Sequence, residues 1–267
     1  MKTCIFTIIK NEQEYIEDFI KYHINIGIDT LFIFEDIDSL SHKDITDRYS
    51  QVSLHSVTEI IPVEKIMEMK QDGKFQHEYI KKGLLWIRDN FNYDWCFSLD
   101  ADEYITCTDN FPDLLKEYDK YDAIMLHWKN FGCSGHIYKP PHDKPIYEIY
   151  NKECGYTKSD KKLCQCTKMC FNMKHLQEKF IFGMHTALCN YVRPDFTYDR
   201  SKPVFGKIYL RHYITKSWEE YVWKLKKRGM MYKTHRGYDD FFEMNKNMLP
   251  LKDKLLKIAD EILLKYK

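Results

Sequence analysis

The sequence of 267 residues lacks an apolar run of about 18 residues, the length that a helix needs to cross a bilayer. Its first apolar run, within residues 1–12, is too short for a signal peptide and has no small-residue cleavage site. We therefore expect a protein without a transmembrane segment that is made and kept in the cytosol.

An excess of either charge is also missing, since 41 Lys and Arg stand against 40 Asp and Glu for a formal net charge of +1. A balanced charge gives no global field that would attract nucleic acid, so we expect no nucleic-acid partner. Aromatic residues, by contrast, are frequent at 15%. They could stack on a base or a sugar, although aromatic side chains more often fill a core.

Paired cysteines at zinc-ribbon or zinc-finger spacing are absent. The nine cysteines are an odd number in a chain without a secretion signal, which favours free thiols over a disulfide framework. A local group raises the alternative of a structural metal: Cys154, Cys164, Cys166 and Cys170, with His175 nearby. Because no Cys-x-x-Cys pair occurs in it, scattered thiols are the favoured interpretation.

Short apolar runs alternate with helical patterns through the first half of the chain, without an internal repeat or a low-complexity segment. The predicted strands are 3–9, 31–34, 52–57, 95–99 and 123–128. The predicted helices are 15–26, which follows a turn at 10–12, and 43–49, 75–90 and 110–119. This alternation predicts an α/β fold with a Rossmann-like, mostly parallel sheet flanked by helices. Ligands of such sheets bind outside the carboxyl ends of the strands.

The second half is less regular. Residues 138–162 have no apolar stripe and predict a long surface segment, a lid or an acceptor loop. Strand candidates follow at 166–172, 183–190 and 207–210, and Ser217 is a good N-cap for the next helix. Residues 252–266 predict an amphipathic helix that packs on the core, and its lysines leave room for weak contact with a membrane surface.

The most informative stretch is the apolar run 95–99, which ends on Asp100, Asp102 and Glu103. On an extended segment, Asp100 and Asp102 would point to the same side. Carboxylates are the ligands that Mg²⁺ and Mn²⁺ prefer. The pair therefore predicts a divalent metal site, and the alternative is a solvated turn or a helix cap.

Four patches, taken together and in order, make the chain resemble glycosyltransferase family 2-like and family 92-like proteins, once catalogued as a domain of unknown function. The patches lie within residues 8–23, 99–104, 128–136 and 212–229. The resemblance runs from about Thr3 to Gly229.

The resemblance implies a GT-A fold, a nucleotide-sugar donor such as a UDP-sugar, a saccharide acceptor, Mn²⁺ or Mg²⁺, and inversion at the anomeric carbon. Assembly of a surface polysaccharide would be the setting. The implied domain covers residues 1–230, with a nucleotide-binding half at 1–105 and an acceptor half at 106–230. Residues 231–267 would form a C-terminal helical extension. The oligomeric state stays open.

The resemblance also assigns roles to individual residues. Donor contacts fall on Lys10, Asn11, Glu12, Asp36, Asp100, Ala101, Asp102 and Lys216; metal contacts on Asp100, Asp102, His185 and His212; and acceptor contacts on Trp128, Phe131 and His136. Asp102 and Glu178 are the candidate catalytic residues, Glu178 as the base that takes the acceptor proton. Other bases stay open: Glu103, Asp143, Glu148, Glu153 and His185.

Each of these residues also has an ordinary structural interpretation. Glu178, Lys10 and Lys216 could be solvated charges. His185, His212 and Trp128 could be core residues. The chain also departs from the family at residues 35–39, where acids stand in place of Asn, and it has no recognisable late Glu-Asp pair.

Two other functions are compatible with an acidic strand end. A sugar nucleotidyltransferase would need a Gly-rich loop after the first strand, and residues 9–14 contain no Gly. A non-catalytic carbohydrate-binding descendant would have no need of the intact pair Asp100 and Asp102.

Overall fold

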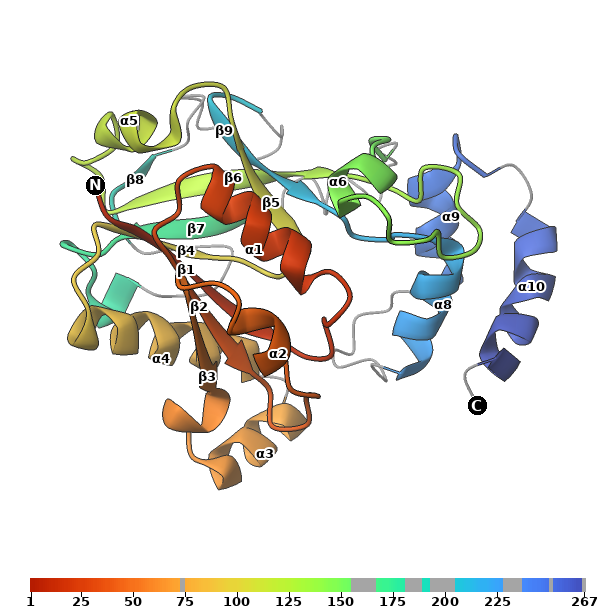
Figure 1. Ribbon diagram of the computed structural model, residues 1–267, viewed down its shortest axis with the longest axis horizontal. Helices are drawn as coiled ribbons and strands as arrows, with labels where there is room; N and C mark the ends of the chain where they lie inside the picture. Colours follow the sequence, from red (N-terminus) through yellow and green to blue (C-terminus); the bar gives the residue numbers. More distant parts are fainter. Residues whose placement is uncertain are drawn as a thin grey trace. The chain divides into compact units, whose positions relative to one another are not determined.

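The structure is a computed structural model that describes residues 1–72, 75–154, 167–180, 189–192, 205–227, 237–249 and 252–265 (Figure 1). The chain divides into two compact units. The first contains Met1–Trp128 and Gln165–Leu210, and the second contains Lys129–Cys164 and Arg211–Lys267. The predicted boundary between residues 230 and 231 lies outside the described residues, so it stays a prediction.

One sheet organises the first unit. In the described part of the chain, its strand order is β3-β2-β1-β4-β7-β6-β9-β5, and β8 pairs with β6. The strands are β1 (Thr3–Ile9), β2 (Thr30–Glu35), β3 (Val52–Ser56), β4 (Trp95–Ser98), β5 (Glu103–Cys107), β6 (Ala123–Asn130), β7 (Thr167–Asn172), β8 (Tyr191–Val192) and β9 (Ile208–His212). Strands β1 to β4 pair in parallel, whereas β7 is antiparallel to both β4 and β6. The predicted Rossmann-like sheet flanked by helices is confirmed.

The helices agree with the sequence pattern to different degrees. They are α1 (Ile16–Asn25), α2 (Lys43–Thr46), α3 (Val63–Asp72), α4 (Phe75–Asn90), α5 (Phe111–Lys116), α6 (Ile146–Ile149), α8 (Trp218–Lys227), α9 (Tyr238–Asn245) and α10 (Lys252–Lys265), with short 3₁₀ turns η1 (Val57–Glu59) and η2 (Glu178–Phe180). The bounds of α4 are those predicted. Helix α1 follows a turn, as expected, in which the carbonyl of Glu12 accepts from the N–H groups of Tyr15 and Ile16.

The elements α3, β5, α6 and β8 were not predicted, and α9 lies within the C-terminal helical extension expected at residues 231–267. The surface segment predicted at 138–162 contains the short helix α6, and its residues 155–162 lie outside the described part. The strand predicted at 183–190 lies mostly outside it as well, and residues 189–190 are not in a strand.

Side chains of β1 alternate between the two faces of the sheet. Cys4 and Phe6 belong to the core cluster that α3 and α4 cover, where the Phe6 ring lies 5.3 Å from that of Phe34. On the opposite face of the neighbouring β4, the Phe97 ring lies 5.4 Å from Phe111 of α5. Figure 1 shows α3 and α4 together on one side of the first three strands.

The second unit has its own core, around the buried Trp218 at the start of α8. The Trp218 indole N–H donates to the carbonyl of Leu255 at 3.0 Å. The hydroxyl of Ser217 accepts from the N–H of Glu220, whose carboxylate accepts in return from the N–H of Ser217, so the predicted N-cap is confirmed as a capping box. Helix α10 buries one apolar face, as predicted.

Two further expectations concern membranes and thiols. Within the described ranges, no helix is long and apolar enough to span a membrane. The cysteines of those ranges are free, in agreement with the favoured interpretation: Cys4, Cys96, Cys107, Cys133, Cys154, Cys170 and Cys189. Cys164 and Cys166 lie outside them.

Candidate active site

The chain turns sharply after β4, and the turn carries the aspartate pair. The N–H of Glu103 donates to the carbonyl of Asp100 at 3.0 Å, which closes residues 100–103 into a tight turn that we call the acidic turn. The expected extended geometry of the pair is therefore wrong. Asp100 and Asp102 are half-buried, and Ala101 between them is buried.

Glu103 ends the acidic turn with its side chain folded inward. The carboxylate oxygen Oε2 accepts from the N–H of Asp100 at 2.9 Å, and the residue is fully buried. The other oxygen, Oε1, has no hydrogen-bond partner among the described residues. Burial raises the pKa of Glu103 well above its ordinary value, and the neighbouring Lys168 opposes this shift.

Lys168 of β7 is the residue of this site that sequence reasoning missed. Its ammonium Nζ lies 2.9 Å from Asp100 Oδ2 and 3.4 Å from Glu103 Oε2, and its side chain is 1% exposed. Burial alone would lower the pKa of Lys168, but the carboxylates of Asp100 and Glu103 raise it above its ordinary value. A lysine within the otherwise uncharged strand 167–172 was the available sequence signal.

The acidic turn fits a hard divalent cation that also uses ligands from a substrate. Mg²⁺ and Mn²⁺ commonly take one or two protein carboxylates and complete their shells with phosphates and water. Asp100 and Asp102 offer such oxygens at a half-buried position. In the part of the chain that is described, no group of three His, Cys, Asp or Glu side chains is placed to hold a metal.

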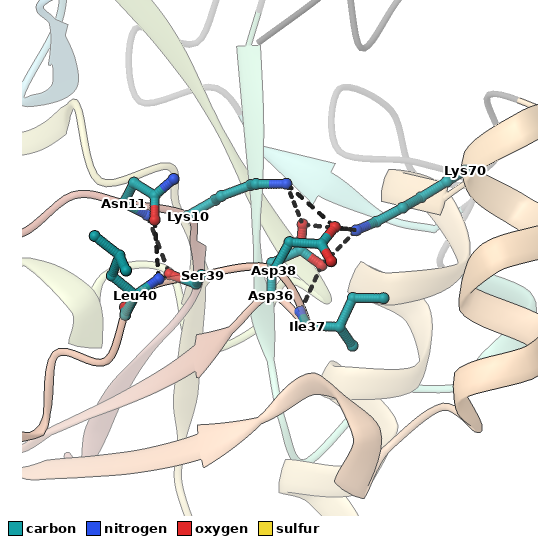
Figure 2. A network of polar contacts seen from close by, with 8 residues as sticks. All are labelled: Lys10, Asn11, Asp36, Ile37, Asp38, Ser39, Leu40 and Lys70. Carbon is teal, nitrogen blue, oxygen red and sulfur yellow. Dashed lines mark hydrogen bonds and ion pairs between the residues drawn. The ribbon is translucent and has the colours of Figure 1, made fainter. Parts of the chain in front are cut away.

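A second polar cluster follows β1 and β2 (Figure 2). Asp36, with its side chain 3% exposed, accepts from the Lys70 ammonium through both oxygens at 2.8 and 2.9 Å. The Lys10 ammonium approaches Asp38 at 3.4 Å and Asp36 at 3.8 Å. Lys70 comes from the unpredicted helix α3, so its role could not be read from the pattern.

The loops after β1 and β2 are fastened to each other. Asn11, at a positive φ of 56° that Asn tolerates better than most residues, donates its N–H to Ser39 Oγ and accepts from the N–H of Leu40 (Figure 2). The N–H of Glu12 donates to His42 Nε2 at 3.0 Å, and His42 Nδ1 donates to Glu35 at 2.8 Å. This network fixes the predicted donor residues of the first loop.

Both clusters lie at one edge of the sheet. Strand β1 pairs in parallel with β2 on one side and with β4 on the other, and the N–H of Leu99 donates to the carbonyl of Phe6. The loop with Lys10, the loop with Asp36 and the acidic turn therefore all follow the carboxyl ends of adjacent parallel strands. Open α/β sheets bind their ligands at this edge.

The predicted acceptor residues have packed surroundings. Trp128 is buried in the first unit. In the second unit, Phe131 is buried with its ring 5.5 Å from that of Tyr213, and the His136 ring lies 5.8 Å from Tyr150.

The remaining predicted residues are distributed over both units. In the second unit, the buried His212 has Nδ1 3.1 Å from Asn130 Oδ1, and Lys216 is half-buried with a φ of 52°. In the first unit, Glu178 is 66% exposed and lies 2.8 Å from the Lys81 ammonium, whose hydrogen bond lowers the pKa of that carboxyl. His185 lies outside the described residues.

No protein-family model and no curated protein matches the sequence. Solved structures do match. Glucosyl-3-phosphoglycerate synthase from Mycobacterium tuberculosis, in complex with Mn²⁺, UDP and phosphoglyceric acid, is 14% identical with a TM-score of 0.34. The match covers 48% of this chain and 43% of the synthase, so the chain spans less than half of that protein.

Two further structures match over most of this chain. HddC from Yersinia pseudotuberculosis is 9% identical over 79% of this chain and 93% of its own, with a TM-score of 0.41. The bifunctional IspDF from Campylobacter jejuni is 9% identical over 77% of this chain and 52% of its own, with a TM-score of 0.34. At these values no residue role is transferred from any of the three proteins, and the family resemblance stays a prediction.

Proposed function

We propose that the protein is a metal-dependent glycosyltransferase that moves a sugar from a nucleotide-diphosphate donor, foremost a UDP-sugar, to a saccharide acceptor with inversion. The observation that carries this proposal is the acidic turn, in which the half-buried Asp100 and Asp102 follow β4. The loops that contain Lys10 and Asp36 follow β1 and β2 at the same edge of the sheet. Only the first unit contributes to this observation.

The chemistry explains why such residues suit the reaction. Breaking the bond from the anomeric carbon to the diphosphate leaves negative charge on the departing phosphate oxygens. Asp100 and Asp102 would hold Mn²⁺ or Mg²⁺, which when bound stabilises that charge as a Lewis acid. Such a cation commonly takes one or two protein carboxylates and completes its shell with substrate phosphates and water.

The polar cluster that contains Lys10, Asp36, Asp38 and Lys70, which we call the Lys10–Asp36 cluster, would bind the nucleotide. Asp36 is fixed by Lys70 and Asn11 by the Ser39 and Leu40 contacts, so neither has to be ordered when a donor binds. Within the proposal, Glu12, Ala101 and Lys216 add donor contacts, and His185 and His212 add contacts to the metal or diphosphate.

The acceptor side rests on the resemblance alone. Trp128, Phe131 and His136 are proposed to bind the acceptor sugar, and Glu178 is proposed to take the proton of its hydroxyl. The exposed Glu178 carboxylate is accessible to a substrate, but its contact with Lys81 makes it a weaker base.

Donor hydrolysis tests the proposal. Purified protein is incubated with a panel of nucleotide sugars, with Mn²⁺ or with EDTA, and release of the nucleoside diphosphate is measured. We expect release from one donor class that requires the metal, and a loss of about 100-fold or more in Asp102→Asn, the scale of losing a main transition-state contact. Asp109→Asn, which changes an exposed carboxylate outside the acidic turn, is the matched control and should keep activity.

The alternatives give different results. A nucleotidyltransferase would release no nucleoside diphosphate from nucleotide sugars, but would release pyrophosphate when it is given a nucleoside triphosphate and a sugar phosphate. A binding protein would retain the nucleotide with Mn²⁺ and release nothing. Full turnover by Asp102→Asn would remove the role given to the acidic turn.

A further inference from the structure

Three side chains on β3 and the turn η1 form a hydrogen-bonded chain away from the acidic turn and the Lys10–Asp36 cluster. The hydroxyl of Ser53 lies 2.7 Å from Nε2 of His55, and Nδ1 of His55 lies 2.7 Å from Oε2 of Glu59. A hydroxyl, an imidazole and a carboxylate in this order are the arrangement that activates a serine in hydrolases, and it is recognised by geometry rather than by sequence position. The proposed glycosyl transfer uses none of the three residues.

The hydrogen bonds determine where the protons of this chain lie. Because a carboxylate can only accept, the N–H of neutral His55 is at Nδ1 and donates to Glu59. Nε2 is then an acceptor, so the hydroxyl of Ser53 donates to it. The second oxygen of Glu59, Oε1, accepts from the N–H of Ser56 at 2.8 Å, which holds the carboxylate in this orientation. The Ser53 hydroxyl therefore faces a base that is itself oriented by a carboxylate.

The position of β3 gives a substrate access to this chain. In the described part of the protein, β3 is the last strand of the sheet and pairs with β2, and both Ser53 and His55 are half-buried. The N–H of Leu31 donates to the carbonyl of Gln51, so the N–H of Leu54 points away from β2, since alternate residues of a strand direct their N–H groups to opposite sides. The N–H that follows a nucleophile is one of the donors that stabilise the oxyanion in acyl transfer.

Aromatic rings beside the chain indicate an apolar substrate. The ring of His55 lies 4.9 Å from that of Trp86 on α4. Ser53 is level with Phe32 in the sheet, and the Phe32 ring lies 4.8 Å from that of Phe91. Phe91 is 41% exposed and Trp86 is half-buried, so part of this aromatic surface can be covered by an apolar group of a substrate.

We propose that Ser53, His55 and Glu59 form a second catalytic site, which hydrolyses carboxylic esters with an apolar acyl group. The oxygen of Ser53 bonds to the ester carbonyl carbon while its proton passes to Nε2 of His55, and Glu59 stabilises the positive charge on the ring. The bond from that carbon to the alcohol oxygen then breaks, and the alcohol leaves with the proton from Nε2. Water cleaves the acyl-serine in the same way: its proton passes to Nε2, its oxygen bonds to the carbonyl carbon, and Ser53 recovers the proton as the acid leaves.

Covalent labelling of the full chain tests this proposal. The protein is incubated with a biotinylated fluorophosphonate, which loses fluoride when a serine oxygen bonds to its phosphorus, and mass spectrometry of the peptides locates the label. Hydrolysis of p-nitrophenyl esters from acetate to octanoate is measured on the same samples. We expect the label on Ser53 and hydrolysis of these esters, both lost in Ser53→Ala. Ser50→Ala, which removes a nearby exposed hydroxyl, is the matched control and should keep both.

The variant Glu59→Gln distinguishes a catalytic chain from a structural one. Its amide oxygen can still accept from the N–H of Ser56, and its NH₂ group then faces Nδ1, so the N–H of His55 moves to Nε2. With this tautomer, His55 cannot take the proton of Ser53. We expect the rates of labelling and of ester hydrolysis to fall by about 100-fold or more, while thermal melts confirm that the variant is folded.

Three results would overturn the proposal: no label on Ser53 of the wild type, equal labelling rates in the wild type and Glu59→Gln, or ester hydrolysis that persists in Ser53→Ala. The proposed glycosyl transfer is tested separately, because labelling and ester hydrolysis are measured with EDTA and without a nucleotide sugar. Release of nucleoside diphosphate should be the same in Ser53→Ala as in the wild type, so either activity can fail without the other.

Discussion

At the scale of the residue, His23 shows how a buried polar ring is made compatible with a core. It is fully buried on α1, where Nδ1 donates to the carbonyl of Phe19 at 2.8 Å and Nε2 accepts from the N–H of Ile105 at 3.3 Å. Both ring nitrogens are satisfied only in the neutral form. Burial accordingly lowers the pKa of His23 to about 3.

The stability of the protein should therefore depend on pH through His23. Because its pKa is about 3 in the folded state and near 6.5 in an unfolded chain, the unfolded state gains a proton first as the pH falls. Between pH 7 and pH 5 this lowers the free energy of unfolding by about 2 kcal/mol. His23→Gln cannot be protonated, so its difference from the wild type should shrink by that amount over this interval in urea denaturation.

An exposed histidine provides the control for this prediction. His77 on α4 is 42% exposed, and His77→Gln should keep the pH dependence of the wild type. Parallel pH profiles for the wild type and His23→Gln would contradict the neutral, buried state of His23.

The same scale shows which site residues a sequence can reveal. Asp100 and Asp102 became candidates because two acids directly follow an apolar strand. Lys70 and Lys168 were not, because their importance comes from partners far along the chain, Asp36 and Asp100. The turn geometry of residues 100–103 also escaped prediction, since a backbone hydrogen bond rather than a side-chain pattern defines it.

At the scale of the element, the close contact of α4 with β1 depends on a residue without a side chain. A Cβ atom at Gly83 would lie 2.2 Å from the ring of Phe6. Phe6 is 1% exposed and its ring lies 5.3 Å from that of Phe34, so it has no open space into which it could move. The glycine sets how closely the helix approaches the sheet.

Gly83→Ala should consequently destabilise the protein although alanine favours helices by about 1 kcal/mol over glycine. We expect a net loss of about 1–3 kcal/mol in the free energy of unfolding, the usual cost of overpacking a core. Phe6→Leu in the same chain should recover part of the loss by making room, and Lys82→Ala at an exposed position of α4 should change little. If Gly83→Ala were more stable than the wild type, α4 could move slightly away from β1 without a loss in the free energy of unfolding.

The helix α4 was predicted from the sequence, whereas α3 was not. The bounds of α4 followed from its apolar stripe, which is buried at Tyr79, Leu84 and Ile87. Helix α3 was not predicted although Val63, Ile66 and Met67 recur at helical spacing; Ile66 is buried, whereas Val63 and Met67 are 45% and 50% exposed. Its position is decided by tertiary contacts such as Lys70 with Asp36.

At the scale of the whole molecule, the chain builds its second unit from two separate segments, Lys129–Cys164 and Arg211–Lys267. Periodicity reports on neighbours in the sequence and cannot show that these segments join. The consecutive halves at residues 1–105 and 106–230 were implied by the family resemblance and stay a prediction. The acidic turn and the Lys10–Asp36 cluster, by contrast, both belong to the first unit. A cation bound at the acidic turn together with its nucleotide would therefore stabilise at least the first unit.

Thermal unfolding measures this coupling between the site and the fold. A ligand present at 100 times its dissociation constant stabilises the folded state by about 2.7 kcal/mol, which corresponds to a rise of about 5 °C or more in the melting temperature of a chain of this size. We expect such a rise for the first unit with Mn²⁺ and UDP together, little change with UDP and EDTA, and no rise in Asp102→Asn. A ligand that binds only the folded protein raises its melting temperature. An equal rise in the melting temperature of Asp102→Asn would therefore mean that the nucleotide binds without the acidic turn.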